Sequence, residues 1–262
     1  MHKETELSNE EQEEVLCHDK FYREEAKAWI LPSYDWEKFD LIERPTHGYI
    51  YSVKSLGDLK HKNVLDLGCG TGWLSVILAK RGANVEAIDI STEAIKVAHE
   101  MAKINQVNDM INFKVGSVYE LEYPNNYFDF VIGQAILHHL TDKNKLIPEL
   151  YRILKLKGKA VFFEPFGESE ILEKIRLLIP VPIDDVDKVN SGKKLKYEDI
   201  EALGKIFTTK HKEFHLISRL DRIIAFAPVI RFLSWIDITL LRSFPFLRKY
   251  ARSIVVELLK EK

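Results

Sequence analysis

The chain has 262 residues, of which 46% are hydrophobic and 30% are charged. This composition is ordinary for a folded globular protein and excludes a wholly disordered chain. The 38 basic and 40 acidic side chains give a net charge of −2. That balance argues against a nucleic-acid binder, because such proteins carry a large positive surplus.

The two cysteines, Cys17 and Cys69, lie far apart, and neither belongs to a Cys/His cluster with metal-ligand spacing. We therefore expect no disulfide framework, no metal site, and a reducing, cytoplasmic location. Six glutamates fall within residues 1–14, where a secretory signal would need a basic and then an apolar stretch. Residues 1–14 are predicted to form an acidic, flexible tail.

Residues 15–60 are predicted to form a helical lid. Apolar and aromatic residues recur at helical spacing between residues 21 and 55, interrupted by Pro32 and Pro45. This pattern indicates two or three short helices. The core is predicted to span residues 61–262, with a substrate-cap insertion at about 166–206 that has its own helix near 170–178.

From residue 62 onward, short apolar runs alternate with amphipathic segments. Strands are predicted at residues 63–67, 84–90, 111–115, 127–133, 158–164, 207–216 and 252–259. Helices are predicted at residues 73–81, after an N-cap at Ser91, at 146–154, and in the apolar stretch between the last two strands. Such alternation predicts βαβ units and a doubly wound, mostly parallel α/β sheet.

A glycine-rich turn follows the first predicted strand, within residues 64–73. Its spacing is G-x-G-x-G, and Trp73 stands where a dinucleotide fingerprint has its third glycine. The Gly-Lys-Ser/Thr of a phosphate-binding loop is also missing. Asp66, two residues before the first glycine, would repel a pyrophosphate but attract an ammonium group or a sulfonium.

This segment resembles motif I of the class I S-adenosylmethionine-dependent methyltransferases, in their small-molecule branch, and the similarity covers about residues 63–165. It implies a Rossmann-like sheet of seven strands with an antiparallel final strand. It also implies S-adenosylmethionine as cofactor, with Asp66 engaging its amino group directly or through water. The residues 128–133 and 154–159 resemble the family's later motifs.

Asp89 lies 21 residues beyond Gly68, a spacing that suits a carboxylate bonded to ribose hydroxyls. Its alternative role is to support the start of the next helix. The family places an acid after Gly116, whereas this chain has Ser117, which could still accept from an amine. The resemblance implies eleven cofactor-binding residues: Tyr22, Asp66, Gly68, Cys69, Gly70, Gly72, Asp89, Ile90, Ser117, Val118 and Gln134. For Tyr22 ordinary helix packing is an equal alternative.

His138, next to His139 and just after the fourth predicted strand, is the candidate general base. It would lie at the carboxyl edge of the sheet, where ligands bind in open α/β folds, and its ordinary pKa near 6.5 suits proton removal. The alternative is that one imidazole packs in the core while the other caps a loop. A base is needed only for a hydroxyl or a protonated amine acceptor.

The stretch 223–258 is apolar with interspersed arginines, and Pro228, Arg231 and Asp237 interrupt every window long enough to span a bilayer. Two interpretations remain open: helices that cover the sheet, or weak association with an anionic membrane surface. The sequence leaves the oligomeric state open.

The leading hypothesis is a methyltransferase acting on a small-molecule or lipid-like acceptor. The alternative is a non-catalytic cofactor-binding module or a membrane-peripheral regulatory partner; an aminopropyltransferase is a third possibility.

Overall fold

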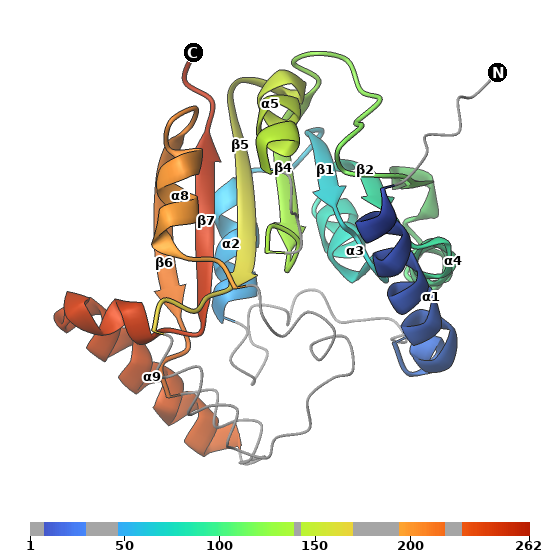
Figure 1. The fold of residues 1–262 in the computed structure, drawn as a ribbon. Helices are drawn as coiled ribbons and strands as arrows, with labels where there is room; N and C mark the ends of the chain where they lie inside the picture. The colour runs from blue at the N-terminus through green and yellow to red at the C-terminus, as the bar shows by residue number, and fades with distance from the viewer. Residues whose placement is uncertain (1–7, 30–46, 139–142, 170–193, 218–226) are drawn as a thin grey trace.

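A computed structural model describes residues 8–29, 47–138, 143–169, 194–217 and 227–262 (Figure 1). Its sheet has seven strands in the order β3-β2-β1-β4-β5-β7-β6. The strands are β1 (Asn63–Leu67), β2 (Asn84–Asp89), β3 (Ile111–Val115), β4 (Phe128–Gln134), β5 (Leu154–Pro165), β6 (Thr208–Phe214) and β7 (Ser253–Leu259). The first five are parallel, and β7 runs antiparallel to both β5 and β6. The predicted doubly wound sheet with an antiparallel final strand is confirmed.

Helices cover both faces of this sheet. The helices are α1 (Asn9–Trp29), α2 (His47–Leu56), α3 (Trp73–Lys80), α4 (Thr92–Ile104), α5 (Lys143–Ile153), α8 (Tyr197–Leu203) and α9 (Ala227–Ser243), with 3-10 turns η2 (Asn108–Met110) and η4 (Pro245–Tyr250). Helices α2, α3 and α4 pack on one face, and α5 and α8 pack on the other. The side chains of β1 alternate accordingly, Val64 toward the first face and Leu65 toward the second.

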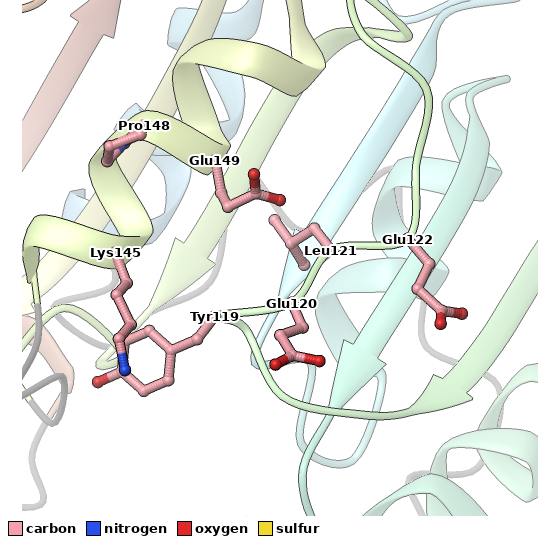
Figure 2. A pocket seen from close by; sticks show the side chains of 7 residues that line it. All are labelled: Tyr119, Glu120, Leu121, Glu122, Lys145, Pro148 and Glu149. Atoms are coloured by element: carbon pink, nitrogen blue, oxygen red, sulfur yellow. The ribbon is translucent and has the colours of Figure 1, made fainter. Parts of the chain in front are cut away.

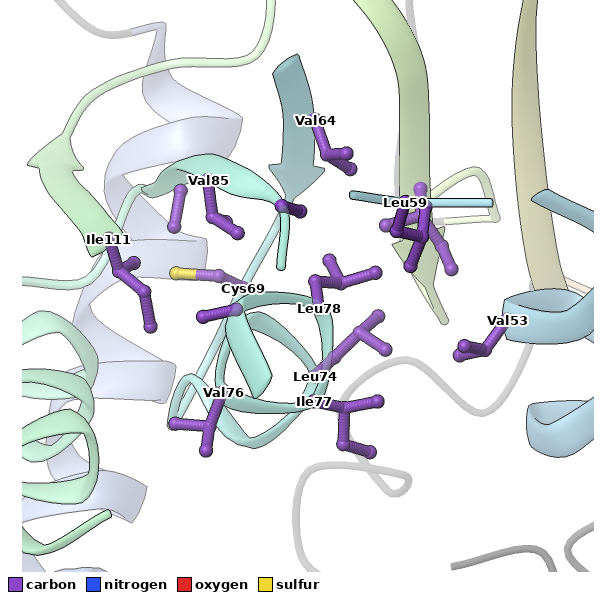
Figure 3. Packing of buried hydrophobic residues seen from close by; sticks show 14 of the residues in the cluster. Val53, Leu59, Val64, Cys69, Leu74, Val76, Ile77, Leu78, Val85 and Ile111 are labelled. Carbon is purple, nitrogen blue, oxygen red and sulfur yellow. The ribbon is translucent and has the colours of Figure 1, made fainter. Parts of the chain in front are cut away.

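The core beneath the glycine turn is built around α3 (Figure 3). Buried side chains of that helix, among them Leu74 and Leu78, pack with Val64 and Val85 of the two neighbouring strands. Cys69 is buried in the same cluster. The glycine turn therefore lies against a closely packed part of the core, which restrains its backbone.

The N-terminal helix begins earlier than the sequence predicted. The tail was expected to reach residue 14, but α1 starts at Asn9, and residues 9–14 form its first turns. The reason is a capping box: the Ser8 hydroxyl accepts from the Glu11 backbone N–H at 3.3 Å, while the Glu11 carboxylate accepts from the Ser8 N–H at 2.9 Å. The rest of the predicted lid contains α2, and residues 30–46 lie outside the described ranges.

The C-terminal third differs in detail from the prediction. The helix expected near residues 170–178 lies outside the described residues, and α8 was not predicted. Helix α9 occupies the apolar stretch between the last two strands and extends beyond their ends at the lower left of Figure 1. In the described ranges, no helix combines the length and apolarity needed to cross a bilayer.

Candidate functional site

The glycine turn joins β1 to α3 at the carboxyl edge of the sheet. Gly70 and Gly72 have φ angles of +51° and +75°, which favour glycine. A Cβ on Gly70 would lie 2.9 Å from the Tyr22 hydroxyl, and one on Gly72 would lie 2.8 Å from the Ala98 Cβ. The absence of side chains here lets two helices, α1 and α4, approach the turn.

Asp89, the last residue of β2, connects this turn to the next helix. Its carboxylate accepts from the backbone N–H of Gly70 at 2.8 Å and from that of Ser91 at 2.9 Å. Burial raises the pKa of Asp89, although these two backbone hydrogen bonds act in the opposite direction. Ser91 is the N-cap of α4, as predicted, because its hydroxyl accepts from the Ala94 N–H at 3.0 Å.

A cavity of about 240 Å³ opens above the turn and Asp89. Helix α1 forms one wall, and the carboxyl ends of strands β1 to β5, or the segments that follow them, form the rest. Nine of the predicted site residues line it: Tyr22, Gly68, Gly70, Asp89, Ile90, Ser117, Val118, Gln134 and His138. The structure thus brings together, in one cavity, residues from sequence segments more than 100 positions apart.

Asp66, Cys69 and Gly72 do not appear among the lining residues. Asp66 is 1% exposed and accepts a hydrogen bond from the Ser75 hydroxyl at 2.5 Å. Its burial raises its pKa to about 7, against the effect of the Ser75 hydrogen bond. The Cys69 side chain lies in the core (Figure 3). The expected contact between Asp66 and a ligand amino group stays a prediction.

Helix α1 is fastened over the cavity by carboxylates. Asp19 accepts from the Ser91 hydroxyl at 2.5 Å and from the Glu93 backbone N–H at 3.2 Å. Near the start of the helix, Glu11 accepts from the Ser117 hydroxyl at 2.5 Å. Glu11, which lines the cavity, was missed by the sequence analysis because residues 1–14 were assigned to a tail.

Two polar groups of the cavity wall are buried. The Gln134 side-chain amide nitrogen meets no hydrogen-bond acceptor among the described residues. Tyr22 packs its hydroxyl against Gly70, and burial raises the pKa of that hydroxyl. A buried amide donor without an acceptor is costly, so the Gln134 amide is suited to a ligand oxygen.

Glu164, near the end of β5, holds the segment that follows β4. Its carboxylate accepts from the backbone N–H groups of Ile136 and Leu137, both at 3.0 Å, and from that of His138 at 3.4 Å. It also lies 2.8 Å from His138 Nδ1. In the tautomer whose Nδ1–H donates to Glu164, Nε2 is the ring nitrogen that can accept a proton.

Glu164 lies at the end of the strand predicted over residues 158–164, but no role was predicted for it. The available signal was an acidic residue at the carboxyl edge of a strand that is otherwise apolar there. Within the described part of the chain, no group of three or more His, Cys, Asp or Glu side chains is arranged to hold a metal ion.

A second depression lies beside the first, between the segment after β3 and α5 (Figure 2). It measures about 460 Å³, and its lining includes Tyr119, Glu120, Lys145 and Glu149. Of these residues, only Tyr119 also lines the first cavity. Because none of the motif residues faces this depression, the first cavity is the candidate active site.

Residues 65–162 match the family model described as a methyltransferase domain. The chain is 37% identical over 137 residues to the norajmaline N-methyltransferase of Rauvolfia serpentina, which covers 52% of this chain and 46% of that protein. It is 34% identical over 137 residues to a ubiquinone biosynthesis O-methyltransferase of Coxiella burnetii, covering 52% of this chain and 56% of that protein. The chain therefore spans about half the length of the curated relatives it matches.

Solved structures share the fold at low sequence identity. A phosphoethanolamine N-methyltransferase 2 of Haemonchus contortus, in complex with S-adenosyl-L-methionine, has a TM-score of 0.60 and 18% identity, covering 100% of this chain and 62% of that chain. A geranyl diphosphate C-methyltransferase of Streptomyces coelicolor has a TM-score of 0.57 and 14% identity, covering 82% and 79%. Residues 65–162 are therefore similar to a methyltransferase domain, and the solved structures share the fold that carries it.

Proposed function

We propose that this chain transfers a methyl group from S-adenosylmethionine to an oxygen, nitrogen or carbon atom of a small-molecule or lipid-like acceptor. The observation that carries the proposal is the cavity itself, in which the glycine turn, the Asp89 carboxylate and His138 converge at the carboxyl edge of the sheet. The names of the relatives support N- and O-methylation of small molecules.

The residues present fit this cofactor. The buried Asp89 carboxylate suits the two ribose hydroxyls, and Ile90 with Val118 gives apolar surfaces for the adenine ring. The buried amide of Gln134 suits the carboxylate of the methionine portion. Gly68 and Gly70 allow the ligand to approach the backbone closely.

Glu11 adds an acceptor that the motif itself lacks. At the position after Gly116 this chain has Ser117 rather than an acid. The Ser117 hydroxyl donates to Glu11 and so holds the Glu11 carboxylate beside that position. Burial opposes the charge of Glu11, but hydrogen bonds from Ser117 and Ser8 lower its pKa and keep it ionised. We infer that Glu11 accepts a hydrogen bond from the exocyclic amine of adenine.

The bound cofactor supplies an activated methyl group on a positive sulfonium, and its thioether departs as a neutral group. The chain's part is to align the acceptor and to exclude water, effects that together contribute about 7–11 kcal/mol. Helix α1 closes one side of the cavity for this purpose. His138 would remove the proton of a hydroxyl or ammonium acceptor through Nε2, because Glu164 occupies Nδ1.

Calorimetry with S-adenosylmethionine and with NAD tests the proposal. We expect binding of the first and none of the second, and the Asp89→Ala variant to lose about 1–3 kcal/mol of binding free energy through unpaired ribose hydroxyls. Asp109→Ala, an exposed position beyond α4, is the matched control. Binding of NAD instead, or unchanged affinity in Asp89→Ala, would contradict the assignment. Once S-adenosylmethionine is shown to bind, mass spectrometry of small molecules that copurify with the chain would identify the acceptor.

A further inference from the structure

Helix α9 buries polar residues and exposes apolar ones. Ser234 and Asp237 are each 3% exposed, whereas Phe232, Trp235 and Ile238 are 58%, 62% and 49% exposed. The three exposed residues follow one another at intervals of three, so they form one stripe along the helix. Leu241 of the same helix is buried, but an ordinary surface helix turns a stripe of large apolar residues toward the core, whereas this stripe faces outward.

Asp237 fixes this orientation. Its carboxylate accepts from the backbone N–H groups of Leu216 and Ile217, both at 2.9 Å, just after β6. Rotating α9 to bury the aromatic stripe would pull Asp237 away and leave these donors without their acceptor, which is costly for buried groups. The fold therefore holds the apolar stripe outward.

Exposed apolar residues also occur at and just before the 3-10 turn η4, which follows α9 and contacts it. Phe244 and Phe246 are 47% and 65% exposed, and their ring centroids lie 6.0 Å apart. On α9 the rings of Phe232 and Trp235 stack at 6.1 Å. We call this set the aromatic surface; it comprises Phe232, Trp235, Ile238, Phe244 and Phe246. Large exposed apolar patches of this kind mark contacts with partners or membranes.

Among the described side chains of α9 and the 3-10 turn, the exposed charges are of one sign. Arg242 and Lys249 are exposed and Arg248 is partly exposed, whereas the one acidic residue between 227 and 250, Asp237, is buried. Aromatic rings favour the interfacial layer of a bilayer, and cations near them attract anionic headgroups. A helix with this pattern is suited to lie in the plane of the interface.

We propose that the aromatic surface docks this chain onto an anionic lipid bilayer as a peripheral protein. A second copy of the chain fits less well, because a two-fold contact would place the same patch on itself, and the cations around it would then face cations. The proposal does not depend on methyl transfer, since α9 contributes no residue to the lining of the cavity.

Vesicle flotation with the full chain tests this proposal. We expect binding to phosphatidylcholine vesicles that contain about 30% phosphatidylglycerol, weaker binding to phosphatidylcholine alone, and loss of binding at high salt. The Phe232→Ser/Trp235→Ser variant should bind at least about tenfold less. Leu156→Ser, which changes a side chain with the same 58% exposure as Phe232, is the matched control.

A charge variant gives a second, independent readout. Arg242→Glu/Lys249→Glu should lose the preference for anionic vesicles, whereas Lys205→Glu, at an exposed position between α8 and β6, should keep it. Affinity for S-adenosylmethionine should be unchanged in all four variants. Equal vesicle binding by the wild type and both surface variants would overturn the proposal. So would light scattering that shows a dimer converted to a monomer by the aromatic variant, which would assign the surface to self-association.

Discussion

The carboxylate of Glu164 lies 2.8 Å from His138 Nδ1 and also accepts from three successive backbone N–H groups, those of residues 136–138. One buried side chain of β5 thus sets both the path of the segment after β4 and the orientation of the imidazole. In the reaction proposed above, Glu164 is a positioning residue, because it acts through His138.

Glu164→Gln should slow the reaction and destabilise the fold. The amide has a single oxygen to accept, and its NH2 group would face a donor, so at least one buried N–H loses its partner, at about 1–3 kcal/mol. With a hydroxyl acceptor we expect kcat to fall by about 10²-fold or more, with cofactor affinity nearly unchanged. The readouts are steady-state kinetics across pH and urea denaturation.

Two further variants separate positioning from stability. Glu213→Gln alters another buried glutamate, which accepts from the Tyr197 hydroxyl at 2.8 Å and does not line the cavity; it should lose stability while keeping kcat. The double variant His138→Ala/Glu164→Gln should have the same kcat as His138→Ala alone, because the two residues act as a unit. If the losses of kcat in the two single variants add fully in the double variant, Glu164 acts separately from His138.

Glu11→Gln should alter the recognition of the cofactor's purine. In the proposed site, the wild-type carboxylate would accept from the exocyclic amine of S-adenosylhomocysteine, but it would repel the carbonyl oxygen of the inosine analogue. We expect the wild type to favour the adenine ligand by about tenfold or more, and the glutamine variant, whose amide donates to a carbonyl, to lose most of that preference. The ratio of the two dissociation constants is measured by calorimetry.

Glu13→Gln is the control for this comparison, because Glu13 lies on the same helix with its side chain exposed. The ratio of its dissociation constants for the adenine and inosine ligands should equal that of the wild type. A ratio unchanged by Glu11→Gln would remove Glu11 from the cofactor site and leave it the role of fastening α1 to Ser117.

Gly70→Ala should both strain the turn and displace α1. A left-handed φ costs about 1–2 kcal/mol for a residue with a Cβ, and this Cβ would lie 2.9 Å from the Tyr22 hydroxyl. Adding Tyr22→Phe should recover the part that is due to the contact. Gly57→Ala serves as the comparison, because it has a φ of +84° and nothing within 4 Å of the added atom; urea denaturation should show the smaller loss there.

Asp66 makes stability depend on pH. Burial raises its pKa to about 7 in the folded chain from an ordinary 3.8, so the folded state binds the proton more tightly than the unfolded state does. This contribution to stability is complete below about pH 4 and is lost as pH rises through 7. Between about pH 5 and 8 the wild type should lose on the order of 2–4 kcal/mol relative to Asp66→Asn, measured by urea denaturation at several pH values.

Ser75→Ala provides the internal check on this prediction. The Ser75 hydroxyl donates to Asp66 and lowers its pKa. Removing this hydroxyl should therefore move the midpoint of the pH-dependent fall in the free energy of unfolding to higher pH. A parallel pH dependence in the wild type and in Asp66→Asn would show that another group causes the decline.

The sequence predicted the parts of this site that depend on local structure. The apolar run ending at Leu67, the glycine turn and the Ser91 N-cap can each be recognised within a few residues, and all three are confirmed. The contact of Glu11 with Ser117 joins residues 106 positions apart, and that of Glu164 with His138 joins residues 26 apart. Such contacts follow from how helices and strands assemble, which periodicity does not encode.

The start of α1 and the orientation of α9 show two different reasons for incomplete prediction. For α1 the signal was present, since Ser8 and Glu11 have capping-box spacing, but the many glutamates favoured a tail. For α9 the apolar pattern was compatible both with covering the sheet and with an outward stripe. Only the buried hydrogen bonds of Asp237 decide between them.

The attachment of Asp19 to Ser91 and Glu93 has a consequence for ligand exchange. The serine hydroxyl that caps α4 is also the donor that holds α1 over the cavity. Lifting α1 therefore removes an acceptor from the Glu93 amide and loosens the first turn of α4 at the same moment. Amide hydrogen exchange at Glu93 and Ala94 should consequently slow when a ligand holds α1 in place over the cavity. The opening of the first turn of α4 therefore reports on whether a ligand can enter beneath α1.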